Sequence, residues 1–182
     1  MHLNMLTLTY LPLLATLSFN DLKLKETAWG SALTDIQIPQ NWKFRHSERA
    51  NTYAWEGFVY GDATVAVAAF TPKSQKLYEV TLIIGDPLDF PAARYKYMTY
   101  QTRMTKLYGK HTHHYNIIQE PYFKNGGYDT LALKDGKYNF SHFWNNFSNT
   151  FIGMAITPEG WTAITFESKQ YRKVALEEGE KL

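Results

Sequence analysis

The sequence predicts an α+β domain, in which an antiparallel sheet is packed on one face by a single main amphipathic helix at about residues 91–108. Three observations support this fold class. Aromatic residues make up 16% of the chain, which favours sheet over a helix bundle. After residue 52, short β-rich runs alternate with turn sequences. One segment between these runs instead repeats its apolar residues at the period of a helix.

Length and composition indicate one domain, at residues 19–182. The formal net charge of +2 is too small to indicate nucleic-acid binding, so no nucleic-acid partner is expected. The absence of cysteine excludes a disulfide framework, a thiolate metal site and a cysteine nucleophile. No transmembrane segment is expected, because no apolar stretch approaches the roughly 20 residues that a spanning helix needs.

The N-terminal residues 1–18 form a possible degenerate signal segment. The uncharged apolar stretch Leu6–Leu17 has the length of a signal-peptide hydrophobic region, and the small residues Thr16 and Ser18 could form a cleavage site before Phe19. This predicts a periplasmic or secreted protein. Because no Lys or Arg precedes the stretch and its first apolar residues alternate with threonines, a β-strand of a cytoplasmic protein is the alternative.

Three β-rich runs follow, at Tyr53–Tyr60, Ala63–Phe70 and Leu77–Ile84. Turn sequences separate them, so the runs predict an antiparallel meander. Both alternating sets of the middle run are apolar. We therefore expect the middle run to be the central strand of the three, covered on both faces.

The helix is expected to begin after a capping Asp89, with Pro91 in its first turn, and to end at Gly109. Its apolar stripe should pack against alternate residues of the preceding strand. The stripe consists of Ala93, Tyr97, Tyr100, Met104, Leu107 and Tyr108, and the strand residues are Tyr78, Val80, Leu82 and Ile84.

The rest of the chain is predicted to return to strands. These strands are Thr112–Gln119, Leu131–Lys134, Lys137–Phe143, Phe151–Ile156 and Trp161–Glu167. Asp135-Gly136 predicts a hairpin between the second and third of them. The residues Thr157–Gly160 predict a turn between the last two. The charged tail 168–182 lacks an apolar stripe and is predicted to be a surface or frayed end.

Three sequence motifs carry a resemblance to a known group of proteins. They are F-V-Y-G-D followed by V-A-V-A-A-F in the meander, the helix end Leu107–Lys110, and the hairpin I-T-P-E-G-W-T-A-I-T-F-E-S. Over about residues 55–167 the chain resembles small, mostly uncharacterised secreted or periplasmic proteins of Bacteroidota. The resemblance implies export and an α+β fold, and it carries no catalytic residue.

Aromatic side chains are the first candidate binding residues, because Tyr and Trp give large contact area at low entropic cost. Trp55, Tyr60, Trp144 and Trp161 could form a platform for a sugar or a protein, with Tyr122, Tyr128 and Phe143 as further members. The alternative is that most of them pack inside the sheet.

A basic ridge on the helix is the second candidate. Lys96, Arg103, Lys106 and Lys110 fall on one arc beside the apolar stripe, and no acidic residue interrupts them. The ridge could meet an acidic partner or an anionic surface. The alternative is a solvated flank that suits the helix dipole.

The histidines after the helix are a weak metal candidate. On a strand, His111 and His113 would share a face, and a further ligand could come from His46, His142 or Glu120. The alternative is an exposed strand start without metal, and no cofactor is predicted.

No motif of a serine hydrolase, P-loop or dinucleotide-binding enzyme occurs. Ser141 and His142 are adjacent on a predicted strand, so their side chains should point to opposite faces. The leading hypothesis is a non-enzymatic exported accessory or binding domain that contacts a protein or glycan partner through an aromatic-rich sheet surface. The alternatives are a small cytoplasmic immunity- or inhibitor-type protein-binding module, and a hydrolase with an unrecognised site.

Overall fold

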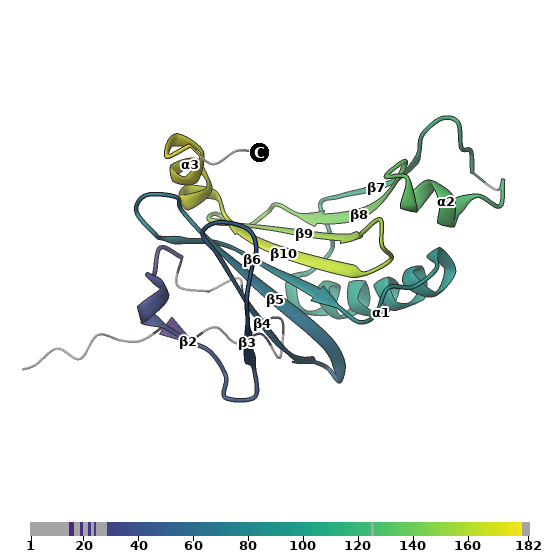
Figure 1. Cartoon of the computed structure of the whole chain (residues 1–182). Helices are drawn as coiled ribbons and strands as arrows, with labels where there is room; N and C mark the ends of the chain where they lie inside the picture. Colours follow the sequence, from purple (N-terminus) through teal and green to yellow (C-terminus); the bar gives the residue numbers. More distant parts are fainter. Residues whose placement is uncertain are drawn as a thin grey trace, which may run out of the picture.

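A computed structural model describes residues 29–124 and 126–179, together with Ala15–Thr16, Phe19, Leu22 and Leu24. Eight strands form one antiparallel sheet in the order β3-β4-β5-β6-β10-β9-β8-β7, and a long helix, α1, lies across one of its faces (Figure 1). The predicted α+β fold class is therefore confirmed. The strands of this sheet are β3 (Lys43–Arg45), β4 (Thr52–Val59), β5 (Asp62–Phe70), β6 (Leu77–Ile84), β7 (His113–Ile118), β8 (Tyr138–Trp144), β9 (Thr150–Ile156) and β10 (Thr162–Ser168).

The remaining elements are a small parallel strand pair and the helices. β1 (Ala15–Thr16) pairs with β2 (Ile36–Gln37), which follows the 3-10 helix η1 (Leu33–Asp35). The helices are α1 (Phe90–Tyr108), α2 (Asp129–Lys134) and α3 (Lys169–Glu177). The predicted signal segment lies outside the described residues except for β1.

The predicted meander is confirmed by the pairing of β4, β5 and β6, with β5 between the other two. The sequence predicts cover on both faces of the middle strand β5, but its two faces differ in burial. Ala66 and Ala68 are completely buried on the face that α1 covers. Val65 and Val67, which point to the other face, are only half-buried, because no helix lies over them.

Helix α1 has the predicted caps. The Asp89 side chain accepts a hydrogen bond from the Ala92 backbone N–H at 3.1 Å, and Pro91 occupies the first turn. Gly109 ends the helix at a φ of 79°, and its N–H donates to the Thr105 carbonyl. Local sequence therefore sets both ends of this helix.

The predicted burial of the α1 stripe is confirmed except at Leu107, but the helix packs mainly over β9 and β10 rather than over the preceding strand β6, and Tyr78 of that strand does not meet it. Leu107 is 36% exposed, because it lies on the flank of Lys96 and Arg103 rather than within the buried arc of the helix. Tyr78 is buried, but on the opposite face of the sheet. The pairing of β5 with β6 shifts its register at Ala69/Phe70, and this shift points the Tyr78 side chain to the open side of the sheet. Tyr78 therefore packs on Ala69 and not on α1.

This difference gives a direct stability test of the α1 packing. Met104 is completely buried against the sheet, so Met104→Ala is expected to lower the free energy of unfolding by about 2–5 kcal/mol. Leu107→Ala, on the same helix, should lower it by less than about 1 kcal/mol, because the side chain already contacts solvent. Urea unfolding of both variants measures the difference, and equal losses would contradict the packing described above.

Two predicted elements differ from the structure. The segment Leu131–Lys134 is part of helix α2, not a strand. Consecutive residues Ala132 and Leu133 are buried, and Gly136 closes the helix by donating to the Leu133 carbonyl. In the described part of the tail, Lys169–Glu177 form helix α3 rather than a frayed end, because Ser168 caps the helix and Ala175 is completely buried.

Candidate functional site

Strand register divides the sheet into a covered face and an open face. The covered face carries the row Trp55, Ala66, Leu82, Ile164, Met154 and His142, which lie opposite one another on successive strands. The corresponding row on the open face is Lys43, Glu56, Val65, Ile83 and Ala163. Helix α3 covers only one end of the open face, where Ala175 packs on Ala69 and Tyr78.

The open face contains a hollow of about 710 Å³ over β3–β6. This volume falls within the roughly 300–1,000 Å³ that is typical of ligand-binding sites. The hollow is lined mainly by apolar groups, including Phe58, Val65, Ile83, Pro87 and Trp161. It is therefore the described cavity best suited to an apolar group of a partner.

Charged side chains from β3 and β4 line the same hollow. Arg45 Nη1 lies 2.7 Å from Glu56 Oε1, and both side chains are more than half exposed. An ion pair that contacts water contributes little to stability, so these charges stay available to a partner. Lys43 adds a second exposed cation beside them. Asp86, which follows β6, adds a second exposed acid beside Glu56. The hollow thus combines an apolar floor with a charged rim, in which the cations Lys43 and Arg45 lie on β3.

A ladder of aromatic rings extends the apolar surface of the open face across β7–β9. The ring centroids of Tyr115 and Phe143 are 5.7 Å apart, and those of Phe143 and Phe151 are 5.6 Å apart and stacked. Tyr115 is 43% exposed. An aromatic-rich open face therefore exists, although it is built mainly from residues other than the predicted ones.

The four predicted aromatic residues do not form one platform. Trp161 lines the hollow, but Trp55 and Trp144 are buried on the covered face, so their rings are not accessible. Trp144 donates its ring N–H to the Gly109 carbonyl at 2.8 Å. Tyr60 is partly exposed beneath the Arg103 guanidinium, which lies 4.0 Å from its ring centroid.

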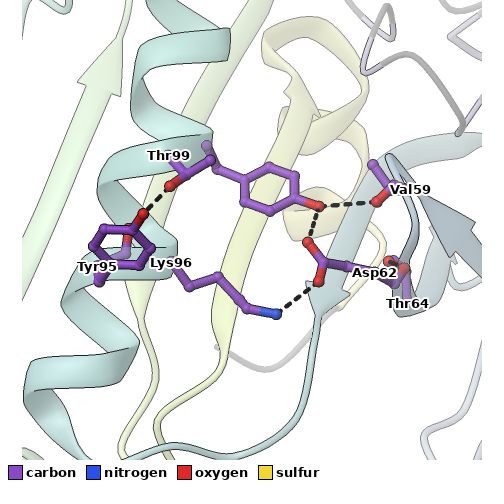
Figure 2. A network of polar contacts seen from close by, with 7 residues as sticks. Val59, Asp62, Thr64, Tyr95, Lys96 and Thr99 are labelled. Carbon is purple, nitrogen blue, oxygen red and sulfur yellow. Dashed lines mark hydrogen bonds and ion pairs between the residues drawn. The ribbon is translucent and has the colours of Figure 1, made fainter.

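The predicted basic ridge is largely engaged within the chain. Lys96 Nζ lies 2.7 Å from Asp62 Oδ1, at the turn between β4 and β5 (Figure 2). The Tyr100 hydroxyl also contacts Asp62 at 2.8 Å, and Arg103 stacks on Tyr60. Lys106 and Lys110 are exposed. This network therefore ties α1 to the sheet and leaves a smaller cationic surface than predicted.

Asp62 titrates abnormally in this network. Burial alone would raise its pKa, but hydrogen bonds from Lys96 and Tyr100, with the charges of Lys96 and Arg103, lower the pKa below its ordinary value. The ion pair therefore stabilises the fold above the ordinary pKa of about 3.8, and this contribution is lost as pH falls through the lowered pKa.

Replacement of Lys96 by Met is expected to raise the pKa of Asp62 and to lower the free energy of unfolding at pH 7 by up to about 1 kcal/mol. The difference between variant and parent should disappear once acid protonates Asp62. Carboxyl NMR titration and urea unfolding provide the measurements. Lys106→Met is the matched control on the same helix, and an equal effect there would show that the ion pair contributes nothing specific.

The predicted histidine pair is separated in the structure. His113 begins β7 and points to the open face, whereas His111 precedes the strand and turns towards the covered face. His111 instead meets His114 and His142, with ring centroids 5.4 and 4.4 Å away. Within residues 29–124 and 126–179, no group of three or more His, Asp or Glu side chains is arranged to hold a metal ion.

Ser141 and His142 point to opposite faces, as predicted. The Ser141 hydroxyl donates to Asn139 at 2.6 Å, whereas His142 contacts the Tyr97 hydroxyl of α1. Apart from Trp161, the residues of the hollow were missed by the sequence analysis, above all Phe58. Its alternation with Glu56 across β4 is a signal that could have placed both on one face.

In the part of the chain that the structure describes, no helix has both the length and the apolar character needed to span a bilayer. Comparison with known proteins found no matching family model, no matching curated protein and no matching solved structure.

Proposed function

We propose that this chain is a non-enzymatic binding domain that holds a protein partner on the open face of its sheet. The observation that carries the proposal is the hollow over β3–β6, where an apolar floor is exposed beside charged groups. Phe58 is 59% exposed there and Trp161 is half-buried. Exposed apolar surface with a polar rim is typical of protein interaction sites.

The chemistry of the hollow favours an apolar side chain of the partner, with acidic groups on the side of β3, where Lys43 and Arg45 lie, and none beside Asp86 after β6. Such an anchor would bury the Phe58 ring and contact Trp161, and aromatic residues in the centre of an interface contribute most to affinity. Lys43 and Arg45 at the rim would contact the acidic groups and accelerate association. The aromatic ladder of β7–β9 would extend the contact along the sheet.

Export to the periplasm or the cell exterior is part of this proposal and rests on the apolar stretch Leu6–Leu17. A second candidate is the cytoplasmic immunity- or inhibitor-type module. It is favoured by the pairing of Ala15–Thr16 with β2, because cleavage before Phe19 would remove β1. The intact mass of the native protein distinguishes the two: a chain that begins at Phe19 supports export, and retention of residues 1–18 supports the second candidate.

Selection of a displayed random peptide library against the full chain tests the binding site. Selected peptides are expected to carry an apolar anchor near acidic residues. Phe58→Ala and Trp161→Ala should each weaken their binding at least about tenfold, because both side chains line the hollow. Tyr95→Ala is the matched control, since Tyr95 is 79% exposed on α1, on the other side of the sheet. Its peptide affinity should equal that of the parent.

A glycan array with the same variants tests the alternative that the partner is a glycan. Binding of sugars that depends on Trp161, without any peptide that depends on Phe58, would contradict a protein partner. Turnover of a substrate that is abolished by one polar substitution would contradict a non-enzymatic domain.

A further inference from the structure

Three histidine rings meet between the end of α1 and the edge of the sheet. His114 of β7 lies directly opposite His142 of β8, and their rings are stacked with centroids 5.7 Å apart. The ring of His111 stands edge-on to His142 at 4.4 Å. The His142 Nδ1 atom is 2.6 Å from the Tyr97 hydroxyl of α1. We call His111, His114 and His142 the histidine cluster.

The charged and titratable groups around the cluster are cationic or neutral. Lys110 lies beside His111, and α1 presents the neutral Tyr97 to His142. Arg94 of the same helix lies over the ring of Phe140, two residues along β8. No carboxylate of the described residues forms an ion pair with a cluster histidine. A protonated ring in the cluster is therefore repelled by nearby positive charge, and no ion pair among the described residues offsets this repulsion.

Burial acts in the same direction as these charges. Burial chiefly, and then the charges of His111 and His114, lower the pKa of His142 to about 4. Burial also lowers the pKa of His111, together with the charges of His114 and Lys110. The buried Nδ1 atom of His111 has no hydrogen-bond partner in the described chain. The closed arrangement consequently favours neutral rings at His111 and His142.

Strand β7 is the element that can yield to repulsion within the cluster. It lies at the edge of the sheet and pairs only with β8 there. Five of its six side chains are exposed and none is buried. Backbone hydrogen bonds, with little apolar burial, therefore hold β7, which is typical of the segments of a protein that open first.

We propose that protonation of the histidine cluster in mildly acidic solution releases β7 from β8 while the remaining sheet stays folded. Opening separates His114 from His142 and lets water solvate the added charges. It also exposes the backbone N–H and C=O groups of β8, an edge to which an extended segment of another chain can pair. The fold thus contains an acid-sensitive edge that is independent of the hollow on the open face.

The pH range follows from the difference between closed and open states. Opening hydrates His142 and raises its pKa from about 4 towards the ordinary 6.5, so the open state binds more protons than the closed state within the range from about pH 6.5 to 4. The closed state is fully favoured above this range and loses its advantage as pH falls. For His142 alone, the opening equilibrium should rise by up to about 30-fold between pH 7.5 and pH 5.

Hydrogen exchange of the full chain tests the proposal, with rates corrected for the pH dependence of intrinsic exchange. The amides of β7 should lose protection by at least about tenfold between pH 7.5 and pH 5. The amides of β5 should keep theirs, because β5 lies between two strands and carries buried residues. Loss of protection in both strands together would indicate global unfolding and overturn the proposal, as would a β7 that stays protected at pH 5.

Matched variants identify the residues responsible. His142→Gln removes the ring on which the expected effect rests and should reduce the pH effect on β7 at least threefold, whereas His113→Gln, on the open face of β7, should leave it unchanged. Equal behaviour of the two variants would overturn the proposal. The His142→Gln variant should fold, because the introduced amide can still hydrogen-bond to the Tyr97 hydroxyl, and His111→Asn provides a second neutral replacement within the cluster. An unchanged pH effect in both cluster variants would equally reject it.

Discussion

Trp144→Ala is expected to lower the free energy of unfolding by about 3–5 kcal/mol, one of the largest losses from any single truncation in this chain. The Trp144 side chain is completely buried on the covered face of β8. Its removal leaves a large cavity, and the Gly109 carbonyl loses the ring N–H that donates to it at 2.8 Å. Since Gly109 ends α1, the loss weakens both the sheet and the connection that follows the helix.

Urea unfolding measures this loss, and two further variants separate its causes. Trp144→Phe fills most of the cavity without restoring the hydrogen bond, so its loss should be intermediate. Phe143→Ala, the neighbouring residue on the open face, should cost clearly less, because its ring is only half-buried. A Trp144→Ala protein as stable as Phe143→Ala would contradict the burial of Trp144.

The contrast between Phe143 and Trp144 shows which information the sequence lacked. Alternation along β8 groups Trp144 with Tyr138 and Phe140 and groups Phe143 with Asn139 and Ser141, but both residues are aromatic, so it does not show whether the face of Phe143 stays open. Pairing with β9 and the position of α1 decide it: Trp144 lies opposite Ile152, which is completely buried. The meander and α1 were predictable because turn residues and helix caps act locally.

Tertiary pairing also explains what the sequence could not predict about the sites. The histidine cluster depends on the register that places His114 opposite His142, residues 28 positions apart in the chain. Likewise, the hollow depends on four strands whose open-face residues are individually unremarkable. Helix α2 was mistaken for a strand because Asp135-Gly136, a common hairpin sequence, here closes a helix instead.

Gly160→Ala is the second substitution with a large expected effect. Gly160 lies in the predicted turn between β9 and β10, at a φ of 91° that side chains with a Cβ rarely adopt. A Cβ there would lie 1.9 Å from the Leu88 carbonyl oxygen, and backbone cannot rotate aside as a side chain can. We expect a loss of about 1–2 kcal/mol from the backbone conformation and roughly 1–3 kcal/mol more from the collision.

Gly61→Ala separates these two contributions. Gly61 has nearly the same φ, 89°, but a Cβ there would meet no atom within 4 Å, so only the conformational loss should remain. The collision between Gly160 and Leu88 should also disturb the hollow. Pro87 precedes Leu88, Trp161 follows Gly160, and Pro87 and Trp161 both line the hollow. Gly160→Ala should therefore change the fluorescence of Trp161, measured against Trp161→Phe to isolate its signal, whereas Gly61→Ala should not. Equal stability losses in the two alanine variants would contradict the close contact between this turn and Leu88.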